Sequence, residues 1–331
     1  MAASASTQAV WFALIGNGFL TVVKFFAFMA SGSGAMFSEA IHSLADTANQ
    51  GLLAVGIKRS LRPADAMFPY GFGGERYLFA LLSAVGIFVL GCGVTLYHGV
   101  HMLLEPEPLH ITWHPYAVLT LALLVDGFVL SKALAAVNAE RGERGLLEHL
   151  RQSSDPTVSA VLLEDGVACL GVIIALVALG VAQFTGSTLP DAVATLVIGC
   201  MLGGVAIWLG VQNRSLIVGR AIPAPVQAAV LAYLTEQPTV SGVRNVRSRI
   251  VGAGSYRLTA ELDWDGAALA AALHAWVESR ADSLATPEER ASFTREFGAR
   301  FAEVHSAEID RIEAQLRERF PELHYLDFES D

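Results

Sequence analysis

Residues 38–50 read SEAIHSLADTANQ and place His42 and Asp46 four residues apart inside an otherwise apolar run. Four residues make about one helical turn, so we expect both side chains on the same face of one helix. An imidazole and a carboxylate that lie side by side can bind a divalent cation, and ionisable groups at membrane depth are costly unless they serve a function. The stretch therefore predicts a membrane helix that carries part of a metal site.

The composition places the chain in the membrane class. Of its 331 residues 53% are hydrophobic and only 16% are charged, and the mean hydropathy is +0.47, which is too apolar for a soluble protein of this length. The net charge of -10, without a face dense in Lys and Arg, argues against nucleic-acid binding. The three cysteines stand singly in apolar runs, so we interpret them as packing residues without a disulfide framework.

Six apolar segments approach or reach the roughly 20 residues that cross a bilayer. They cover residues 9–29, 35–57, 77–100, 116–137, 157–184 and 189–209. The first lacks a basic leading region and a cleavage motif, so we expect it to be retained as a span. The sequence thus predicts an all-α membrane domain over residues 1–213.

The basic residues of the connecting loops predict the orientation. They gather after the second and the fourth span: Lys58, Arg59, Arg62, Arg76, Arg141, Arg144 and Arg151. Such loops are cytoplasmic by the positive-inside rule, which places both termini in the cytoplasm. The preference for Arg over Lys and the lack of a transit peptide favour a bacterial inner membrane.

Residues 214–331 are patterned like a soluble domain. Helical spacing over residues 224–236 is followed by the alternation typical of strands over residues 240–251 and 256–264, with Gly252 and Gly254 in the turn between them. A helical insertion over residues 266–302, a helix over 304–320 and a short strand over 323–328 complete the pattern. Without the insertion the order is αββαβ, which predicts a small open sheet covered by helices on one face.

The further metal ligands must come from another span, because a tetrahedral site needs about four. The fifth segment offers Glu164 and Asp165, which point about 100° apart on a helix, so only one is expected to face His42 and Asp46. Alternatively, these charges lie near the span ends and are solvated.

Other polar residues have weaker claims to function. Lys24 could snorkel or pair with an acid such as Asp126. In the soluble third, a second metal site and scattered surface residues are both compatible with the sequence; the residues concerned are His274, His305, His324 and Glu308.

The second, fifth and sixth spans and the stretch before the third span carry a family resemblance. The stretches SEAIHSLADTANQ, FPYGFGGERY and LPDAVATLVIGCMLG resemble the cation diffusion facilitator family of divalent-metal transporters, and LLED in the fifth span is similar to its mitochondrial-type zinc-transporter branch. The resemblance implies a homodimer that exchanges metal for protons, with a metal site between the second and fifth spans and a cytoplasmic ferredoxin-like domain. No resident cofactor is implied.

One departure concerns the ligand set. Most of the family has a His four residues before the Asp of the fifth span, where this sequence has Val161 before Asp165. Glu164, Asn49 or water would then complete a set made of His42, Asp46 and Asp165. The ligand types favour Zn, Co or Fe over Mg or Ca, and Mn and Ni stay open.

Two other functions are compatible with parts of the pattern. An intramembrane metal hydrolase could use His42 and Asp46 to activate water, but the chain lacks an HExxH motif; we therefore do not expect an enzyme. A transporter-like protein that has lost transport and serves as a membrane-anchored binding partner is the stronger alternative, motivated by Val161.

Overall fold

The chain divides into two compact units, which we describe separately: Met1–Val218 and Gly219–Asp331. The structure is a computed structural model that describes residues 2–106, 113–141, 145–146, 156–280 and 284–330. Side chains at 2–16, 136, 139–141, 156–161 and 330 lie outside this description. The last helix of the first unit continues to Val218, where this unit ends.

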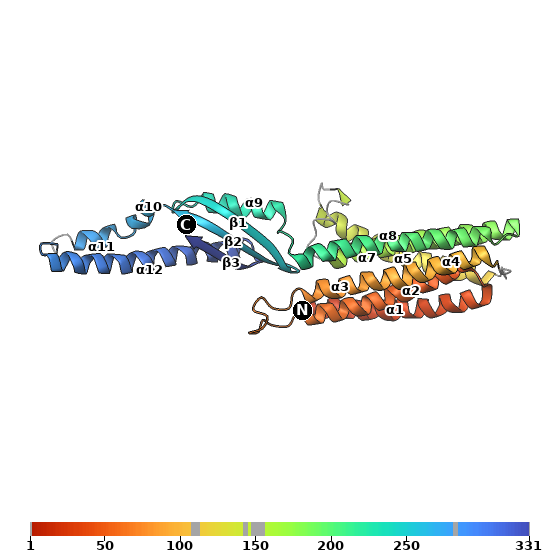
Figure 1. Ribbon diagram of the computed structural model, residues 1–331. Coiled ribbons are helices and arrows are strands. Elements are labelled where there is room, and N and C mark those ends of the chain that lie inside the picture. Colours follow the sequence, from red (N-terminus) through yellow and green to blue (C-terminus); the bar gives the residue numbers. More distant parts are fainter. Residues whose placement is uncertain (1, 107–112, 142–144, 147–155, 281–283, 331) are drawn as a thin grey trace. The chain divides into compact units, whose positions relative to one another are not determined.

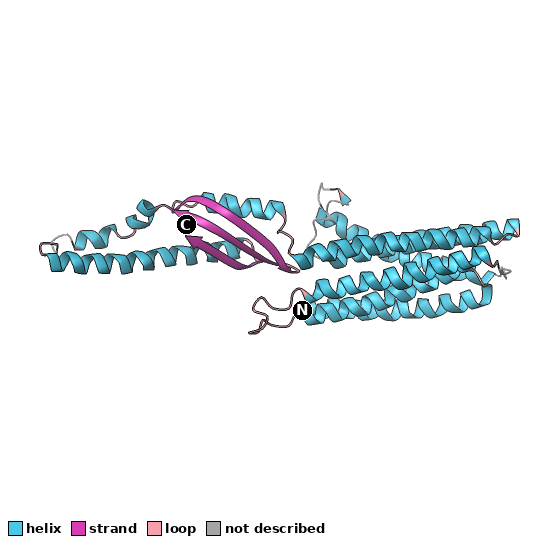
Figure 2. Cartoon of the chain, in the orientation of Figure 1, coloured by secondary structure: helices cyan, strands magenta, loops and turns pink. Residues whose placement is uncertain are grey.

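The first unit is helical, and each of the six predicted segments falls within a helix (Figures 1 and 2). Its elements are α1 (Ala2–Ser31), α2 (Gly34–Ser60), α3 (Glu75–Gly86), the π-helix η1 (Ile87–Val94), α4 (Thr95–Leu104), α5 (Trp113–Arg141), α7 (Pro156–Thr185) and α8 (Leu189–Val218). The third predicted segment corresponds to α3, η1 and α4 in continuous succession. Helix α2 packs against α1, α3, α7 and α8.

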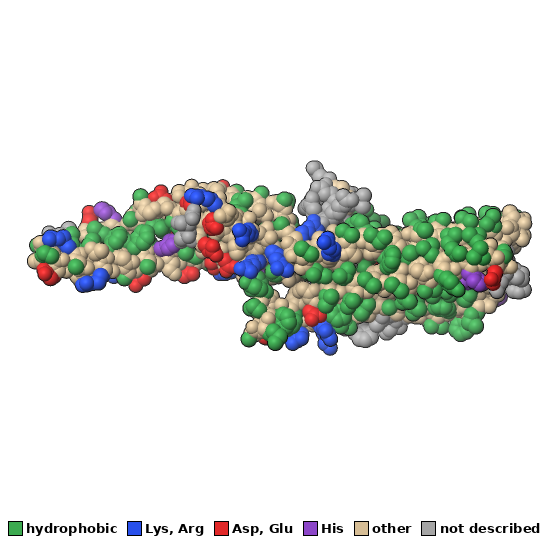
Figure 3. Space-filling model, in the orientation of Figure 1, with side chains coloured by type: hydrophobic (Ala, Val, Ile, Leu, Met, Phe, Trp, Pro, Cys, Tyr) green, Lys and Arg blue, Asp and Glu red, His purple; other side chains and the backbone are tan. Residues whose placement is uncertain are grey.

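Within the described residues, four helical stretches are long and apolar enough to cross a membrane. They are Glu75–Leu104, Trp113–Ala135, Leu162–Thr185 and Leu189–Val218. Hydrophobic side chains cover most of the face of these helices that is visible in Figure 3. Helix α2 is not among the four, because it carries the polar and charged side chains of the predicted site. The membrane class of the first unit is confirmed at this level.

The π-helix η1 is a feature that the apolar pattern did not predict. It lies opposite α8, where small residues allow a close approach: a methyl group added to Gly203 would lie 2.8 Å from Cys92 Sγ, and one added to Gly199 would lie 2.9 Å from Leu96. π-Helical turns are rare and are frequently found at functional sites. The GxxxG spacing of α8 thus serves close packing against η1 and α4.

Asp191 of α8 holds the beginning of α2. Its Oδ1 accepts hydrogen bonds from Ser33 Oγ at 2.8 Å and from the Ala35 N–H at 3.2 Å, and its Oδ2 accepts one from the Gly34 N–H at 2.7 Å. Asp191 is fully buried. A carboxylate at a helix N-terminus satisfies free N–H groups and interacts favourably with the helix dipole, so Asp191 fixes the end of the helix that carries the site.

Replacing Asp191 with alanine is expected to destabilise the first unit by about 2 kcal/mol, because buried N–H groups lose their acceptor. Thermal unfolding of the purified chain in detergent measures the loss. Ser33→Ala is the graded comparison, since it leaves both backbone hydrogen bonds to Asp191 in place, and should have a smaller effect. Equal unfolding temperatures for Asp191→Ala and the unmodified chain would contradict the assigned role.

The second unit is a small α/β domain. Its elements are α9 (Ala224–Thr235), β1 (Val240–Gly252), β2 (Ser255–Trp264), α10 (Gly266–Ala271), α11 (His274–Ser279), α12 (Pro287–Arg319) and β3 (Leu323–Ser330). The sheet order is β1-β2-β3, with β2 antiparallel to β1 and parallel to β3. Gly252 pairs with Ser255, so a two-residue turn joins β1 to β2, and Gly254 in it has φ +64°.

The predicted boundary between a helical insertion that ends at residue 302 and a new helix that begins at residue 304 was wrong, because α12 runs through it. Helix α12 begins at a capping box in which Thr286 and Glu289 exchange hydrogen bonds, with Pro287 at the first turn, and it continues without a break to Arg319. Phe293, nearly two turns into α12, stacks on Trp276 of α11 at 5.5 Å between ring centroids. Phe297 and Phe301 extend this stack along the same face of α12. The residues before 303 and after it therefore belong to one helix.

One face of the sheet is buried under helices. Every second residue of β2 is buried from Tyr256 to Leu262, and the helices contribute buried Leu234 from α9 and Leu316 from α12. The opposite face is polar and includes an ion pair between Arg257 and Asp327 at 2.9 Å. The strand alternation therefore gives a one-sided core, as the sequence predicted.

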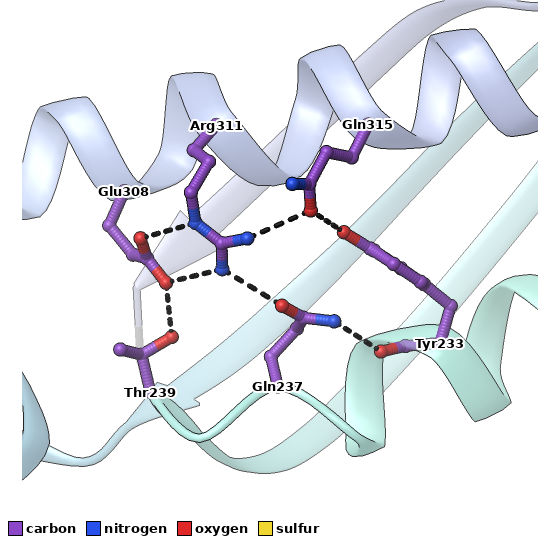
Figure 4. Close-up of polar contacts among 6 residues, drawn as sticks. All are labelled: Tyr233, Gln237, Thr239, Glu308, Arg311 and Gln315. Atoms are coloured by element: carbon purple, nitrogen blue, oxygen red, sulfur yellow. Dashed lines mark hydrogen bonds and ion pairs between the residues drawn. The ribbon is translucent and has the colours of Figure 1, made fainter.

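A hydrogen-bond network joins α9 to α12 (Figure 4). Arg311 Nε donates to Glu308 Oε2, its Nη2 donates to Gln237 Oε1, and its Nη1 donates to Gln315 Oε1, each at 2.8 Å. The Tyr233 hydroxyl also donates to Gln315. The hydrogen bonds from the Arg311 guanidinium lower the pKa of Glu308 below its ordinary value.

Replacing Arg311 with alanine is expected to destabilise a fragment of residues 219–331 by about 2 kcal/mol at pH 7, because Glu308, Gln237 and Gln315 lose a charged donor. A carboxyl group with a lowered pKa stabilises fully above its unfolded value of about 4.3 and loses this contribution as the pH falls through the folded value. Urea unfolding at several pH values should therefore show the difference in stability between the two proteins shrinking as the pH falls below about 4.

Arg317→Ala is the matched control for this prediction. Among the described residues, Arg317 pairs only with Glu313, on the same helix at 2.7 Å, whereas Arg311 donates to three side chains, so the loss of Arg317 should cost less than about 0.5 kcal/mol. An Arg311→Ala fragment as stable as this control would contradict a stabilising role for the network.

Candidate metal site

His42 and Asp46 lie on one face of α2, as their spacing predicted. His42 Nε2 and Asp46 Oδ2 are 3.2 Å apart, and the side chains are 3% and 16% exposed. Neither ring nitrogen of His42, nor Asp46 Oδ1, has a hydrogen-bond partner among the described residues. Buried polar atoms normally have partners, so this pair has the free ligand atoms that a cation site requires.

Glu164 of α7 is joined to α2 through Asn49. Asn49 Nδ2 donates to Glu164 Oε2, and Ser83 Oγ of α3 donates to Asn49 Oδ1. Glu164 is 7% exposed, and its Oε1 has no hydrogen-bond partner within the described part of the chain. Since both polar atoms of Asn49 are engaged, this residue positions Glu164 in the observed arrangement.

Asp165 is partly buried, and its Oδ2 is a buried oxygen for which the described residues provide no hydrogen-bond partner. The charge of Asp46 acts on both Glu164 and Asp165, so both acids of α7 lie in the electrostatic environment of the pair on α2. Val161 lies one turn before Asp165 in α7, but its side chain is outside the described residues.

The predicted ligands form two groups in this conformation. Among the described residues, no three His, Cys, Asp or Glu side chains gather closely enough to hold a metal ion together. The pair on α2 and the acids on α7 belong to packed neighbouring helices. A divalent cation bound by both groups would draw α2 and α7 together.

The sequence did not predict the partner of Lys24. Its Nζ lies 3.2 Å from Glu39 Oε2, rather than pairing with Asp126. Glu39 lies three residues before His42, so the helical spacing that selected His42 and Asp46 also places Glu39 on their face. That spacing was the sequence signal that could have identified Glu39.

A second metal site in the soluble unit is not formed by the described residues. Glu308 is occupied by Arg311 and by Thr239 Oγ1, which donates to it at 2.6 Å. His305 packs against Trp264 with ring centroids 4.7 Å apart. His274, in α11, lies 3.3 Å from Glu278 of the same helix. These side chains therefore serve packing and surface contacts.

Comparison with known proteins identifies the class to which these features belong. The cation efflux transmembrane domain matches residues 10–218, and the chain belongs to the cation efflux family, as the sequence resemblance indicated. It is 36% identical to the mitochondrial proton-coupled zinc antiporter of Homo sapiens, over 97% of this chain and 58% of that protein.

Two further relatives extend the comparison. The chain is 32% identical to metal tolerance protein C4 of Arabidopsis thaliana, over 98% of this chain and 73% of that protein. It is 27% identical to the cation-efflux pump FieF of Shewanella oneidensis, over 70% and 74% respectively. The mitochondrial and plant relatives make the predicted bacterial inner membrane doubtful. The preference for Arg over Lys was a weak basis for that prediction, because the positive-inside rule counts Arg and Lys alike.

Proposed function

We propose that this chain moves a divalent cation out of the compartment that holds its termini, in exchange for protons, by alternating access. The observation that carries the proposal is the buried pair of His42 and Asp46, with free ligand atoms, next to the acids of α7. Membership in the cation efflux family supports it. The ligands are His42, Asp46 and Asp165, with Glu164 and Asn49 as less direct contributors.

The cation is zinc or a similar metal. A nitrogen ligand together with carboxylate oxygens suits borderline metals better than Mg or Ca. Two of the similar proteins are named for zinc transport or for metal tolerance. Co, Fe, Ni and Mn are the competing substrates to be tested.

The same chemistry supplies the coupling. A carboxyl group in a low-dielectric site tends to hold a proton while no cation is bound, and metal binding displaces protons from its ligands. A carrier that is protonated when empty and deprotonated when loaded couples the two fluxes. Rocking of helices around the site provides the alternating exposure.

The proposed topology has six membrane spans with both termini in the cytoplasm, followed by a ferredoxin-like domain over residues 214–331. Its supports are the basic loops, the agreement of each apolar segment with a helix, and the αββαβ order of the second unit with its extra helices. We also propose a homodimer, which the resemblance implies.

The isolated residues 220–331 are expected to fold and to self-associate, since this part of the chain has its own sheet and buried core. Analytical ultracentrifugation over a concentration series measures the association, and circular dichroism checks the fold. A folded fragment that stays monomeric at every concentration would remove the dimerisation role from this unit.

The test of the transport function uses proteoliposomes with an acidic interior, which contain a zinc dye and a pH dye. Zinc added outside should enter as protons leave, and nigericin, which collapses the pH gradient in potassium buffer, should abolish the driven uptake. Zinc binding without zinc movement by the folded chain would instead favour the alternative, a transporter-like protein that serves as a binding partner.

A further inference from the structure

Four polar side chains form a continuous stripe along α2. Glu39, His42, Asp46 and Asn49 follow one another at spacings of three, four and three residues, which places them on one helix face. At about 1.5 Å per residue, Glu39 lies one turn closer to the beginning of α2 than His42 does. In the proposed topology this end of α2 is the side opposite the cytoplasm.

Glu39 is buried with half of its carboxylate unpaired. The residue is 0% exposed, and its Oε2 accepts a hydrogen bond from Lys24 Nζ at 3.2 Å. Its Oε1 has no hydrogen-bond partner among the described residues. An unsatisfied carboxylate oxygen in the interior is costly, and the ion pair alone does not account for it.

The surroundings of Glu39 place its carboxylate directly against α7 and add a second negative charge nearby. A methyl group added to Gly171 of α7 would lie 2.5 Å from Glu39 Oε1, so the carboxylate reaches the backbone of α7 only because residue 171 is glycine. Asp126 of α5 is close enough for its charge to act on Lys24, Glu39 and His42. The pair of Lys24 and Glu39, from α1 and α2, thus also has α5 and α7 around it.

We propose that Glu39 is the next step of the cation path after His42 and Asp46, and that the Lys24 ammonium group occupies this step as a tethered cation until a metal ion displaces it. The inference rests on the proposed function. Lys24 has a flexible four-carbon stem and a compact charge, and the negative charge of Asp126 also acts on it. The ammonium group that is released when the metal reaches Glu39 therefore still has a negative charge nearby.

A neutral double variant, Lys24→Met with Glu39→Gln, separates a cation step from a structural ion pair. Replacing both members of the buried pair removes its two opposite charges together, and the variant is expected to fold. Its zinc transport should fall roughly tenfold or more while zinc affinity, measured by calorimetry on the full chain, changes little. Transport at the unmodified rate would overturn the proposal.

The single variant Lys24→Met provides an independent readout. With the tethered cation removed, Glu39 and Asp126 should bind zinc themselves, so equilibrium dialysis should find one more zinc ion per chain than in the unmodified protein. Lys24→Arg, which keeps the charge, and the neutral double variant should not gain it. A folded Lys24→Met chain without additional zinc would overturn the proposal, and this measurement decides it even if the unmodified chain moves no zinc.

Discussion

Replacing Asp46 with alanine is expected to reduce zinc transport roughly a hundredfold or more, because the proposed site would lose an anionic ligand and a carboxyl group for proton exchange. The chain should stay folded, since Asp46 contacts His42 of its own helix and Asp46 Oδ1 has no hydrogen-bond partner among the described residues. Transport in proteoliposomes and size-exclusion chromatography in detergent measure the two parts of this expectation.

Ser38→Ala is the matched control on the same helix. Ser38 is fully buried, and its Oγ donates to the Gly34 carbonyl oxygen at 2.9 Å within α2. Its loss removes a buried polar group without touching the proposed ligands, and transport should stay close to the unmodified rate. An Asp46→Ala chain that transports as well as this control would remove Asp46 from the site.

Helical periodicity made the face of α2 predictable. The four-residue spacing of His42 and Asp46 was sufficient to place both side chains together, and the structure brings their atoms to 3.2 Å. The strands of the second unit could be predicted in the same way, because the alternation over Tyr256–Leu262 reflects a sheet that is buried on one face. Local patterns with a strict period need no tertiary information.

The contacts between helices were not predictable in the same way. Lys24 could reach acids on several helices, and only the packing of α1 against α2 selects Glu39. Similarly, Asp191 accepts hydrogen bonds from the first N–H groups of α2, a helix that lies far from it in the sequence. Such pairings depend on rotation and depth of the helices, which a single sequence does not encode in its periodicity.

The adjacent acids of α7 show the same limit within the site itself. Sequence spacing separates Glu164 from Asp165 by about 100° but does not say which of them faces α2. In the structure Asn49 holds one oxygen of Glu164, whereas Asp165 Oδ2 is buried with no hydrogen-bond partner in the described part of the chain. Glu164 therefore has one oxygen already engaged by Asn49, whereas the buried Oδ2 of Asp165 is available to a cation.

Asp165→Asn is accordingly expected to reduce zinc transport roughly a hundredfold, because the amide removes an anionic ligand and cannot exchange a proton. Glu164→Gln should retain transport within about fivefold, since the Gln carbonyl oxygen can still accept the Asn49 hydrogen bond. Both variants are compared in the same proteoliposome assay after their folded yield has been matched. A dead Glu164→Gln chain beside an active Asp165→Asn chain would show that Glu164 is the ligand.

Val161→His tests the same assignment by adding a ligand. Position 161 precedes Asp165 by one helical turn, the spacing that already joins His42 to Asp46 on α2. An imidazole there would give α7 the same pair of ligand types, and zinc affinity measured by calorimetry should rise by roughly tenfold or more. The gain should require Asp165, so Val161→His combined with Asp165→Asn should bind zinc no more tightly than Asp165→Asn alone. If the added His raises zinc affinity equally in both backgrounds, it acts at a site that does not include Asp165, and Glu164 becomes the better candidate.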